Sequence, residues 1–325
     1  MRSNTPTRPG LGVLLVLLAS LLWGTTGTAA TFAPEVGPLA IGAAALGVGG
    51  LLQAVVAGRG LVRALPLLRP RWRLVLLGGL AVFAYPLAFY SSMHTAGVTI
   101  GTVVSLGSAP VFAALLDWAV DRRRPSRRWL VAALLGLLGM GVLSVFGGHG
   151  GPAAGGSAAA NAIASPAGDT LAGAGGTGQI GLGVALGLLA GVSYAGYAWA
   201  AHRLIGPGVD SRVAMGAVFG LGGLLLMPVL VATGGPLLSS WRAFGVGAYM
   251  ALVPMFLGYV LFGLALRHID ATSATVLTLS EPVIAAGFAA VIVGERLAGG
   301  GVVGVVLIGA SLVLFALPAN RSRPR

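Results

Sequence analysis

The chain has 325 residues, of which 56% are hydrophobic and 9% are charged, whereas an ordinary soluble domain has about 25% charged residues. This composition excludes a soluble globular protein, and the absence of cysteine excludes disulfides and thiolate metal sites. The formal net charge of +12 does not indicate nucleic-acid binding, because the arginines lie in short gaps between apolar runs and not on one folded surface.

Apolar runs of about twenty residues recur along the chain, which is the length that an α-helix needs to cross roughly 30 Å of hydrocarbon. Turn signals such as DRRRPSRR (121–128) separate these runs. The sequence therefore predicts an all-α integral membrane protein with ten transmembrane helices, at 11–33, 36–57, 73–93, 97–119, 129–146, 180–202, 212–232, 243–266, 271–293 and 298–317.

The arginines are distributed unevenly between the predicted loops. With the N-terminus in the cytoplasm, eighteen of the twenty arginines lie on the cytoplasmic side, and only Arg242 and Arg296 lie outside. Because cytoplasmic loops carry the excess of basic residues, we predict a multi-pass protein of the cytoplasmic membrane with both termini cytoplasmic. Asp117 and Asp121 are expected to offset the charge of the arginine cluster at 122–128.

The first apolar run allows a second interpretation. Arg2 and Arg8, followed by a leucine-rich stretch from Leu11, are also typical of a cleaved signal peptide. Cleavage would leave nine spans and disturb the distribution of arginine, and the repeat described below needs this helix. We therefore expect the first run to be retained as a membrane span.

One segment, 147–179, consists almost wholly of Gly, Ala, Ser, Pro and Thr and lacks the apolar surface needed to fold. It is predicted to be a flexible outer linker. It separates a first repeat of five helices (1–146) from a second (180–317), which is followed by a basic cytoplasmic tail (318–325).

Three matches between the halves support this division. LGVLLVLLA (11–19) resembles LGVALGLLA (182–190), Trp-Arg at 72–73 recurs at 241–242, and SAPVFAA (108–114) resembles SEPVIAA (280–286). All three are offset by about 170 residues. Because five spans is an odd number, the second half must enter the membrane in the opposite sense. This is an inverted repeat, which is typical of secondary transporters with a substrate site near the midplane.

A single acidic residue, Glu281, lies inside the predicted span 271–293. It is ten residues from Ala271, or roughly 15 Å into the membrane, where a carboxylate costs on the order of 2.5–3.5 kcal/mol. Pro282 removes the backbone donor to the carbonyl of Thr278 and should open the helix there. Two interpretations remain open: Glu281 exchanges a proton or contacts a cationic group of the substrate, or it only fixes helix packing through a hydrogen bond.

Other candidate residues share this depth or flank it. Thr278 lies on the same small or polar helical stripe as Glu281, and the equivalent segment of the first half offers Ser105 and Ser108. Aromatic side chains that could line an amphipathic cavity, or else pack between helices, are Trp23, Tyr85, Phe89, Tyr194, Tyr197 and Tyr259. Prolines that could act as hinges are Pro86, Pro110, Pro254 and Pro282.

Several motifs resemble those of a known family. LLWG (21–24), ALRHIDAT leading into LTLSEPVIAA (265–286), and GERL (294–297) are similar to EamA-type members of the drug/metabolite transporter superfamily. The resemblance implies ten helices in two five-helix repeats, cytoplasmic termini and export of small metabolites, amino acids or toxic compounds. DRRRP at 121–125 departs from an acidic-basic pair often found after the fourth span of family members.

We therefore expect a secondary transporter that moves a small metabolite, amino acid or drug-like compound by alternating access, with protons as the possible coupling ion. Its expected partners are the small-molecule substrate and membrane lipids, not nucleic acid, and no pattern indicates an oligomeric state. No GxSxG or HExxH motif is present, so we predict no catalytic residue, metal or cofactor. An uptake permease, an intramembrane enzyme and a non-transporting sensor or scaffold remain alternatives.

Overall fold

The computed structural model describes residues 8–30, 32–122, 124–146, 177–205, 209–288, 291 and 299–316. Within these residues every regular element is a helix. The first half contains α1 (Pro9–Ala30), α2 (Pro38–Gly42), the π-helical η1 (Ala43–Val48), α3 (Gly49–Leu68), the short 3₁₀ helix η2 (Arg69–Arg71), α4 (Trp72–Ala96), α5 (Val98–Asp121) and α6 (Arg127–Phe146).

The second half contains several interrupted helices. Its elements are α8 (Thr177–Ile205), α9 (Ser211–Thr233), the 3₁₀ helix η3 (Gly235–Leu238), α10 (Trp241–Met250), the π-helical η4 (Ala251–Leu257), α11 (Gly258–Ala265), α12 (Ala271–Leu277), the 3₁₀ helix η5 (Thr278–Ser280), α13 (Glu281–Phe288) and α14 (Gly299–Ala316). Because α8 begins at Thr177, the last three residues of the predicted linker are helical. The rest of that linker and the predicted tail lie outside the described residues.

The described helices agree with most of the predicted spans. Seven are long and apolar enough to cross a membrane, and one of them is a 59-residue run, Pro38–Ala96, that includes two predicted spans. The apolar helix Gly299–Phe315 is shorter, and the predicted span 271–293 is divided at η5. Within the long run, α3 bends at Gly58, whose φ of 41° is favourable for glycine, so the predicted end of span 36–57 coincides with a kink. Ten transmembrane helices therefore stays a prediction.

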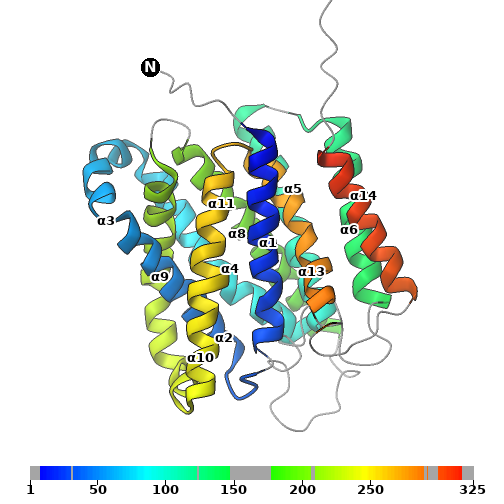
Figure 1. Cartoon of the computed structure of the whole chain (residues 1–325), viewed down its shortest axis with the longest axis horizontal. Helices are drawn as coiled ribbons and strands as arrows, with labels where there is room; N and C mark the ends of the chain where they lie inside the picture. The colour runs from blue at the N-terminus through cyan, green and yellow to red at the C-terminus, as the bar shows by residue number, and fades with distance from the viewer. Residues whose placement is uncertain are drawn as a thin grey trace, which may run out of the picture.

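The start of α1 and the end of α14 lie at the same end of the bundle (Figure 1). We call this the arginine-rich end, because the arginines that follow α5 and begin α6 also lie there. The side chain of Arg128, in α6, donates hydrogen bonds to the carbonyl oxygens of Leu314 (2.6 Å) and Phe315 (3.0 Å) in α14. The next residue, Trp129, donates through Nε1 to the carbonyl oxygen of Thr272 at 3.4 Å. The described chain thus begins and ends on the same side of the bundle.

His268, in the segment between α11 and α12, contacts the chain just before α1 at the arginine-rich end. Partial burial and the nearby Arg267 and Arg8 lower the pKa of His268, so its neutral form is favoured. A neutral imidazole can accept a hydrogen bond, and the backbone N–H of Arg8 lies 3.4 Å from His268 Nδ1.

The first helices of the two halves run in opposite directions. α1 starts at the arginine-rich end, whereas α8 finishes there, where Arg203 forms an ion pair with Asp121 at the end of α5. This is the arrangement that an inverted repeat requires. The ion pair also corrects one expectation, because Asp121 binds Arg203 of α8 and Asp117 accepts a hydrogen bond from the Thr272 hydroxyl of α12. Both carboxylates therefore join the two halves, instead of offsetting the arginine cluster of their own loop.

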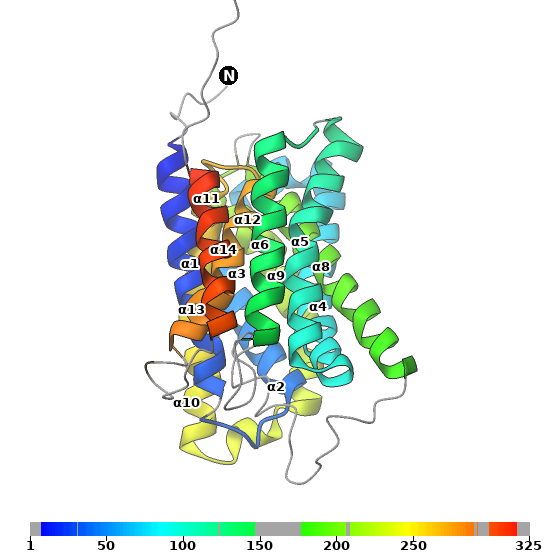
Figure 2. The same cartoon turned by 90° about the vertical axis from the view of Figure 1, so that its right-hand side faces the viewer.

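The main helix contacts join one half to the other. α8 packs against α4 and α5, α9 packs against α3 and α4, and α1 packs against α11 and α13. Figures 1 and 2 both show α6 beside α14. The two halves are therefore interleaved and do not form two separate five-helix bundles.

Glycine makes the closest of these contacts possible. A Cβ added at Gly223 of α9 would lie 2.6 Å from the carbonyl oxygen of Gly47 and 3.0 Å from the backbone nitrogen of Leu51. Both neighbours are backbone atoms, which cannot move aside without shifting a helix. Small residues of this kind allow membrane helices to approach closely.

We expect Gly223→Ala to destabilise the protein by about 1–3 kcal/mol, because the methyl group would force α9 away from η1 and α3. Gly141→Ala is the matched control, since a Cβ at Gly141 of α6 would meet nothing within 4 Å. Thermal unfolding of the detergent-purified variants measures both effects. Equal unfolding midpoints for the two variants would contradict the proposed contact.

Candidate functional site

The six aromatic residues proposed from the sequence form one connected group, here called the aromatic cluster: Trp23, Tyr85, Phe89, Tyr194, Tyr197 and Tyr259. The rings of Tyr194 and Tyr197 stack at a centroid distance of 5.1 Å. The ring centroid of Tyr85, from the first half, lies 5.6 Å from that of Tyr194, and the ring centroids of Trp23 and Tyr259 are 4.9 Å apart. The cluster therefore combines side chains from α1, α4, α8 and α11.

The cluster extends further than the sequence indicated. Phe219 of α9 lies 4.4 Å from Tyr259, and Phe262 of α11 lies 5.5 Å from Trp23 between ring centroids. Tyr90 contacts Phe89 edge-on at 5.3 Å. These three residues were not predicted, because aromatic rings in apolar helices give no sequence pattern that separates a binding surface from ordinary core.

Most of the cluster is closed in this conformation. Tyr197 is completely buried, Tyr194 is 2% exposed, and Trp23 and Tyr259 are each 4% exposed. Tyr85 and Phe89 are partly buried against the same core. The rings of Trp23, Tyr194, Tyr197 and Tyr259 are therefore closed to a solute in this conformation.

Polar atoms inside the cluster are only partly satisfied. The hydroxyls of Tyr197 and Tyr259 share a hydrogen bond of 2.9 Å, and Trp23 Nε1 donates to the carbonyl oxygen of Pro254 at 2.9 Å. The Tyr194 hydroxyl is buried and makes no hydrogen bond of good geometry with the described residues, although the hydroxyls of Thr278 and Tyr197 lie near it. An unpaired buried hydroxyl costs about 1–3 kcal/mol, so this position can accommodate a further polar partner.

The predicted hinge prolines fall into two groups. Pro254 lies within the π-helical η4, and Pro282 is the second residue of α13, two positions after the 3₁₀ helix η5 ends. Such irregular turns mark places where helix geometry is interrupted. Pro86 and Pro110 lie inside α4 and α5, and both helices continue through them. The irregular η1 contains no proline and was not expected from the sequence.

Glu281 is the first residue of α13, at the point where η5 ends. It is partly buried, and it makes no hydrogen bond or ion pair with the part of the chain that the structure describes. Its charge acts electrostatically on the hydroxyls of Tyr85, Tyr90, Tyr194 and Tyr259, without a hydrogen bond to any of them in the described structure. The acid therefore lies in the same part of the bundle as these tyrosines.

The three predicted hydroxyl side chains occupy two different places. Thr278 is buried beside Tyr194 and donates to the carbonyl oxygen of Thr275 at 2.9 Å. Ser108 donates to the carbonyl oxygen of Ser105 at 3.4 Å, and both serines pack against Gly191 of α8. Thr278 thus belongs to the site, whereas the serines lie in the contact between α5 and α8.

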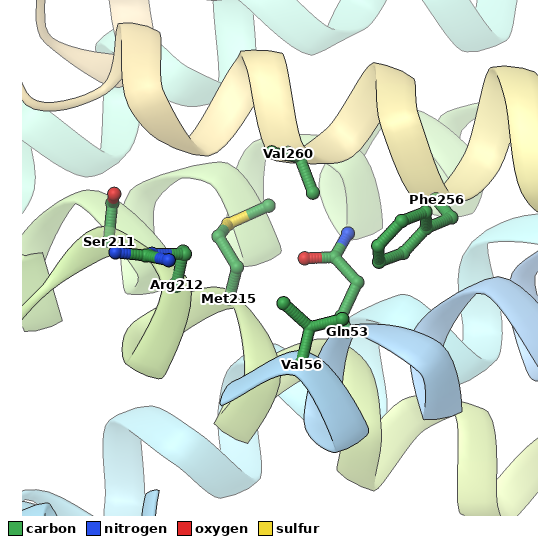
Figure 3. Close-up of a pocket in the computed structure, with 7 residues that line it drawn as sticks. All are labelled: Gln53, Val56, Ser211, Arg212, Met215, Phe256 and Val260. Carbon is green, nitrogen blue, oxygen red and sulfur yellow. The ribbon is translucent and has the colours of Figure 1, made fainter. Parts of the chain in front are cut away.

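A small cavity lies apart from the cluster, between α3, α9, η4 and α11 (Figure 3). Figure 3 shows the Gln53 side chain reaching between Met215 and Phe256. Neither Gln53 Nε2 nor Ser211 Oγ has a partner within the described ranges. The cavity measures about 10 Å³, which suits a single water molecule and leaves no room for a solute.

A helical membrane bundle built from two related halves, with a buried aromatic cluster and a carboxyl that has no described partner, is the architecture found in many membrane transporters. The chain belongs to the EamA-like transporter family, whose model matches residues 10–145 and 181–317. Both repeats are therefore recognised separately, in keeping with the internal matches in the sequence.

Two further comparisons agree with this assignment. The chain is 29% identical over 311 residues to "Uncharacterized transporter YwfM" of Bacillus subtilis (strain 168), and the alignment covers 95% of each protein. A solved crystal structure superposes with a TM-score of 0.69, covering 94% of this chain and 96% of the other. At 19% identity that structure shows the fold alone.

We expect Tyr197→Phe to destabilise the protein by about 1 kcal/mol, because it removes the buried hydrogen bond and leaves the Tyr259 hydroxyl without this partner. Tyr194→Phe is the matched control and should be neutral or slightly stabilising, since the Tyr194 hydroxyl makes no hydrogen bond of good geometry in the described structure. The thermal unfolding midpoints of the purified variants compare the two. A larger loss for Tyr194→Phe would contradict the assignment.

Proposed function

We propose that this EamA-family transporter exports a small metabolite, amino acid or drug-like compound by alternating access, through ten helices arranged as two inverted five-helix repeats. The observation that carries the proposal is the position of Glu281. A carboxyl at an interrupted helix that has no partner among the described residues, and whose charge acts on tyrosine hydroxyls of both halves, is costly for stability and has a direct use in binding. The family match favours transport over an intramembrane enzyme or a non-transporting scaffold.

The chemistry of the site favours substrates that carry an amine or another cationic group. Aromatic faces attract cations, and a carboxylate supplies the opposite charge. The buried Tyr194 hydroxyl and the paired Tyr197 and Tyr259 hydroxyls add hydrogen-bonding groups at the same place. An apolar wall with a few polar groups is the usual form of a small-molecule site.

Coupling to protons follows from the presence of one carboxyl. A carboxyl at this position can hold either a proton or a cationic group of the solute. The two ligands then exclude each other at Glu281. A proton entering on one side can replace a solute leaving on the other, which is the exchange that export against a gradient needs.

Export also depends on orientation. The arginine-rich end contains the loop 121–128, and the excess of basic residues favours the cytoplasm for this end. We therefore place both termini in the cytoplasm and the loop between α9 and α10 outside. An uptake permease would use the same fold with the opposite direction of net transport.

Orientation can be tested by single-cysteine labelling, because the natural chain contains no cysteine. We expect a membrane-impermeant maleimide to label Ser239→Cys in intact cells, since Ser239 is exposed between α9 and α10. Ser3→Cys, near the N-terminus, should react only after the cells are permeabilised. The opposite labelling pattern would reverse the proposed orientation.

We expect Glu281→Gln to reduce transport driven by a pH gradient by at least about tenfold, because the amide keeps the shape of the side chain but cannot exchange a proton. A thermal-shift screen of amines, amino acids, nucleosides and sugars would first identify a compound that stabilises the wild type. Flux of that compound into proteoliposomes, measured with and without the gradient, then gives the result.

Glu35→Gln is the matched control, because Glu35 is exposed between α1 and α2 and undergoes the same chemical change. It should transport as the wild type does. Full gradient-driven flux by Glu281→Gln would rule out the proton role. Loss of compound binding as well as flux would indicate that Glu281 contacts the solute directly.

A further inference from the structure

An apolar groove of about 550 Å³ lies between the end of α5 and the start of α6. Val111, Leu115 and Trp118 line it from α5, and Leu130 and Leu134 line it from α6. Arg124, in the segment that joins the two helices, lies at its polar end. The groove thus combines a long apolar wall with one cationic group at the arginine-rich end of the bundle.

The wall of the groove faces outward. Leu134 is 58% exposed, and Val111, Leu115, Trp118 and Leu130 are all more than 40% exposed. In a membrane-spanning protein these surfaces are covered by lipid chains. Trp118 lies six residues before Arg124 along the chain, near the end of α5, and tryptophan is favoured at the level of the lipid headgroups. The polar end of the groove therefore lies where a lipid phosphate would be.

The two carboxylates of the segment 117–128 are occupied elsewhere in the described structure. The segment 117–128 contains five arginines and two aspartates. Asp121 is bound to Arg203, and Asp117 accepts the Thr272 hydroxyl, so both carboxylates are directed to the other half of the protein. Arg124 is exposed and forms no ion pair with any described residue.

We propose that this groove binds one anionic phospholipid, with an acyl chain along the wall of α5 and α6 and the phosphate on Arg124. A basic group between two membrane helices on the cytoplasmic side is a recognised setting for an acidic headgroup. A zwitterionic lipid would bring an additional cation toward the arginine cluster, which disfavours it. The site is separate from the aromatic cluster and does not depend on the direction or the substrate of transport.

A second copy of the chain fits the groove less well. In a two-fold dimer the same surface of each copy would face the other, so both arginine clusters would lie at the same end of the interface. Like charges placed opposite each other oppose association. An anionic lipid instead supplies the charge that the cluster lacks.

The full-length protein in detergent can be tested by native mass spectrometry with dioleoyl phosphatidylglycerol and dioleoyl phosphatidylcholine. We expect the wild type to retain phosphatidylglycerol in preference to phosphatidylcholine. Arg124→Gln should weaken binding of phosphatidylglycerol by about fivefold, the contribution of one arginine near an anionic headgroup, and leave phosphatidylcholine unchanged. Leu134→Trp, which fills the groove from an exposed position, should weaken both lipids.

Arg63→Gln is the matched control, because Arg63 is an exposed arginine of α3, and that helix packs against the start of α9 at the same end. It removes the same charge and should change binding by less than about twofold. Equal losses for Arg124→Gln and Arg63→Gln would overturn the proposal in favour of general surface charge.

Three other results would also overturn it. Glycerol phosphate displacing the lipid at equal concentration would indicate a phosphate site without a chain-binding groove. Full lipid binding by Leu134→Trp would exclude the groove. A dimer that dissociates on this substitution would show that a second copy covers the groove.

Discussion

Close contact between helices is the constraint on which this structure depends. In a membrane the lipid chains are as apolar as leucine, so burial of apolar side chains gives the helices little reason to associate. Packing must supply that energy, and it does so where glycine lets one backbone touch another, as at Gly223 beside Gly47. The same contacts draw α9 and α8 against helices of the first half and so place the tyrosines of both halves in one cluster.

Much of this could be predicted from the sequence, because its strongest signals are those that the membrane imposes. Apolar length predicted helices, and the distribution of arginine predicted that α1 begins at the arginine-rich end. The lone acid in an apolar run singled out Glu281, whose role stays a prediction. Helical spacing also predicted that Tyr85 lies beside Phe89 and Tyr194 beside Tyr197, since residues three or four apart share one helix face, whereas the contacts between helices that join these pairs to Trp23 and Tyr259 carry no such signal. These features depend on the spacing of apolar residues and on the free-energy cost of a charge in the membrane, and both can be recognised in a single sequence.

Other features depend on which helices touch, and the sequence contains no signal for that. Asp117 and Asp121 stand beside arginines in the chain, yet their partners are Thr272 and Arg203, far away in sequence. Ser105 and Ser108 matched the stripe of Glu281 but pack on Gly191 of α8. The π-helical η1 lacks the proline that would have revealed it. In each case a tertiary contact decided the outcome.

The interleaving of the halves determines which parts of the protein can move as units. α1 packs on α11 and α13, and α8 packs on α4 and α5, so the first helix of each repeat belongs mechanically to the other repeat. A rocking motion cannot follow the boundary between the repeats without tearing these contacts. Each repeat made as a separate polypeptide would expose the surfaces meant for its counterpart, so two fragments should become functional only when synthesised together in the same membrane.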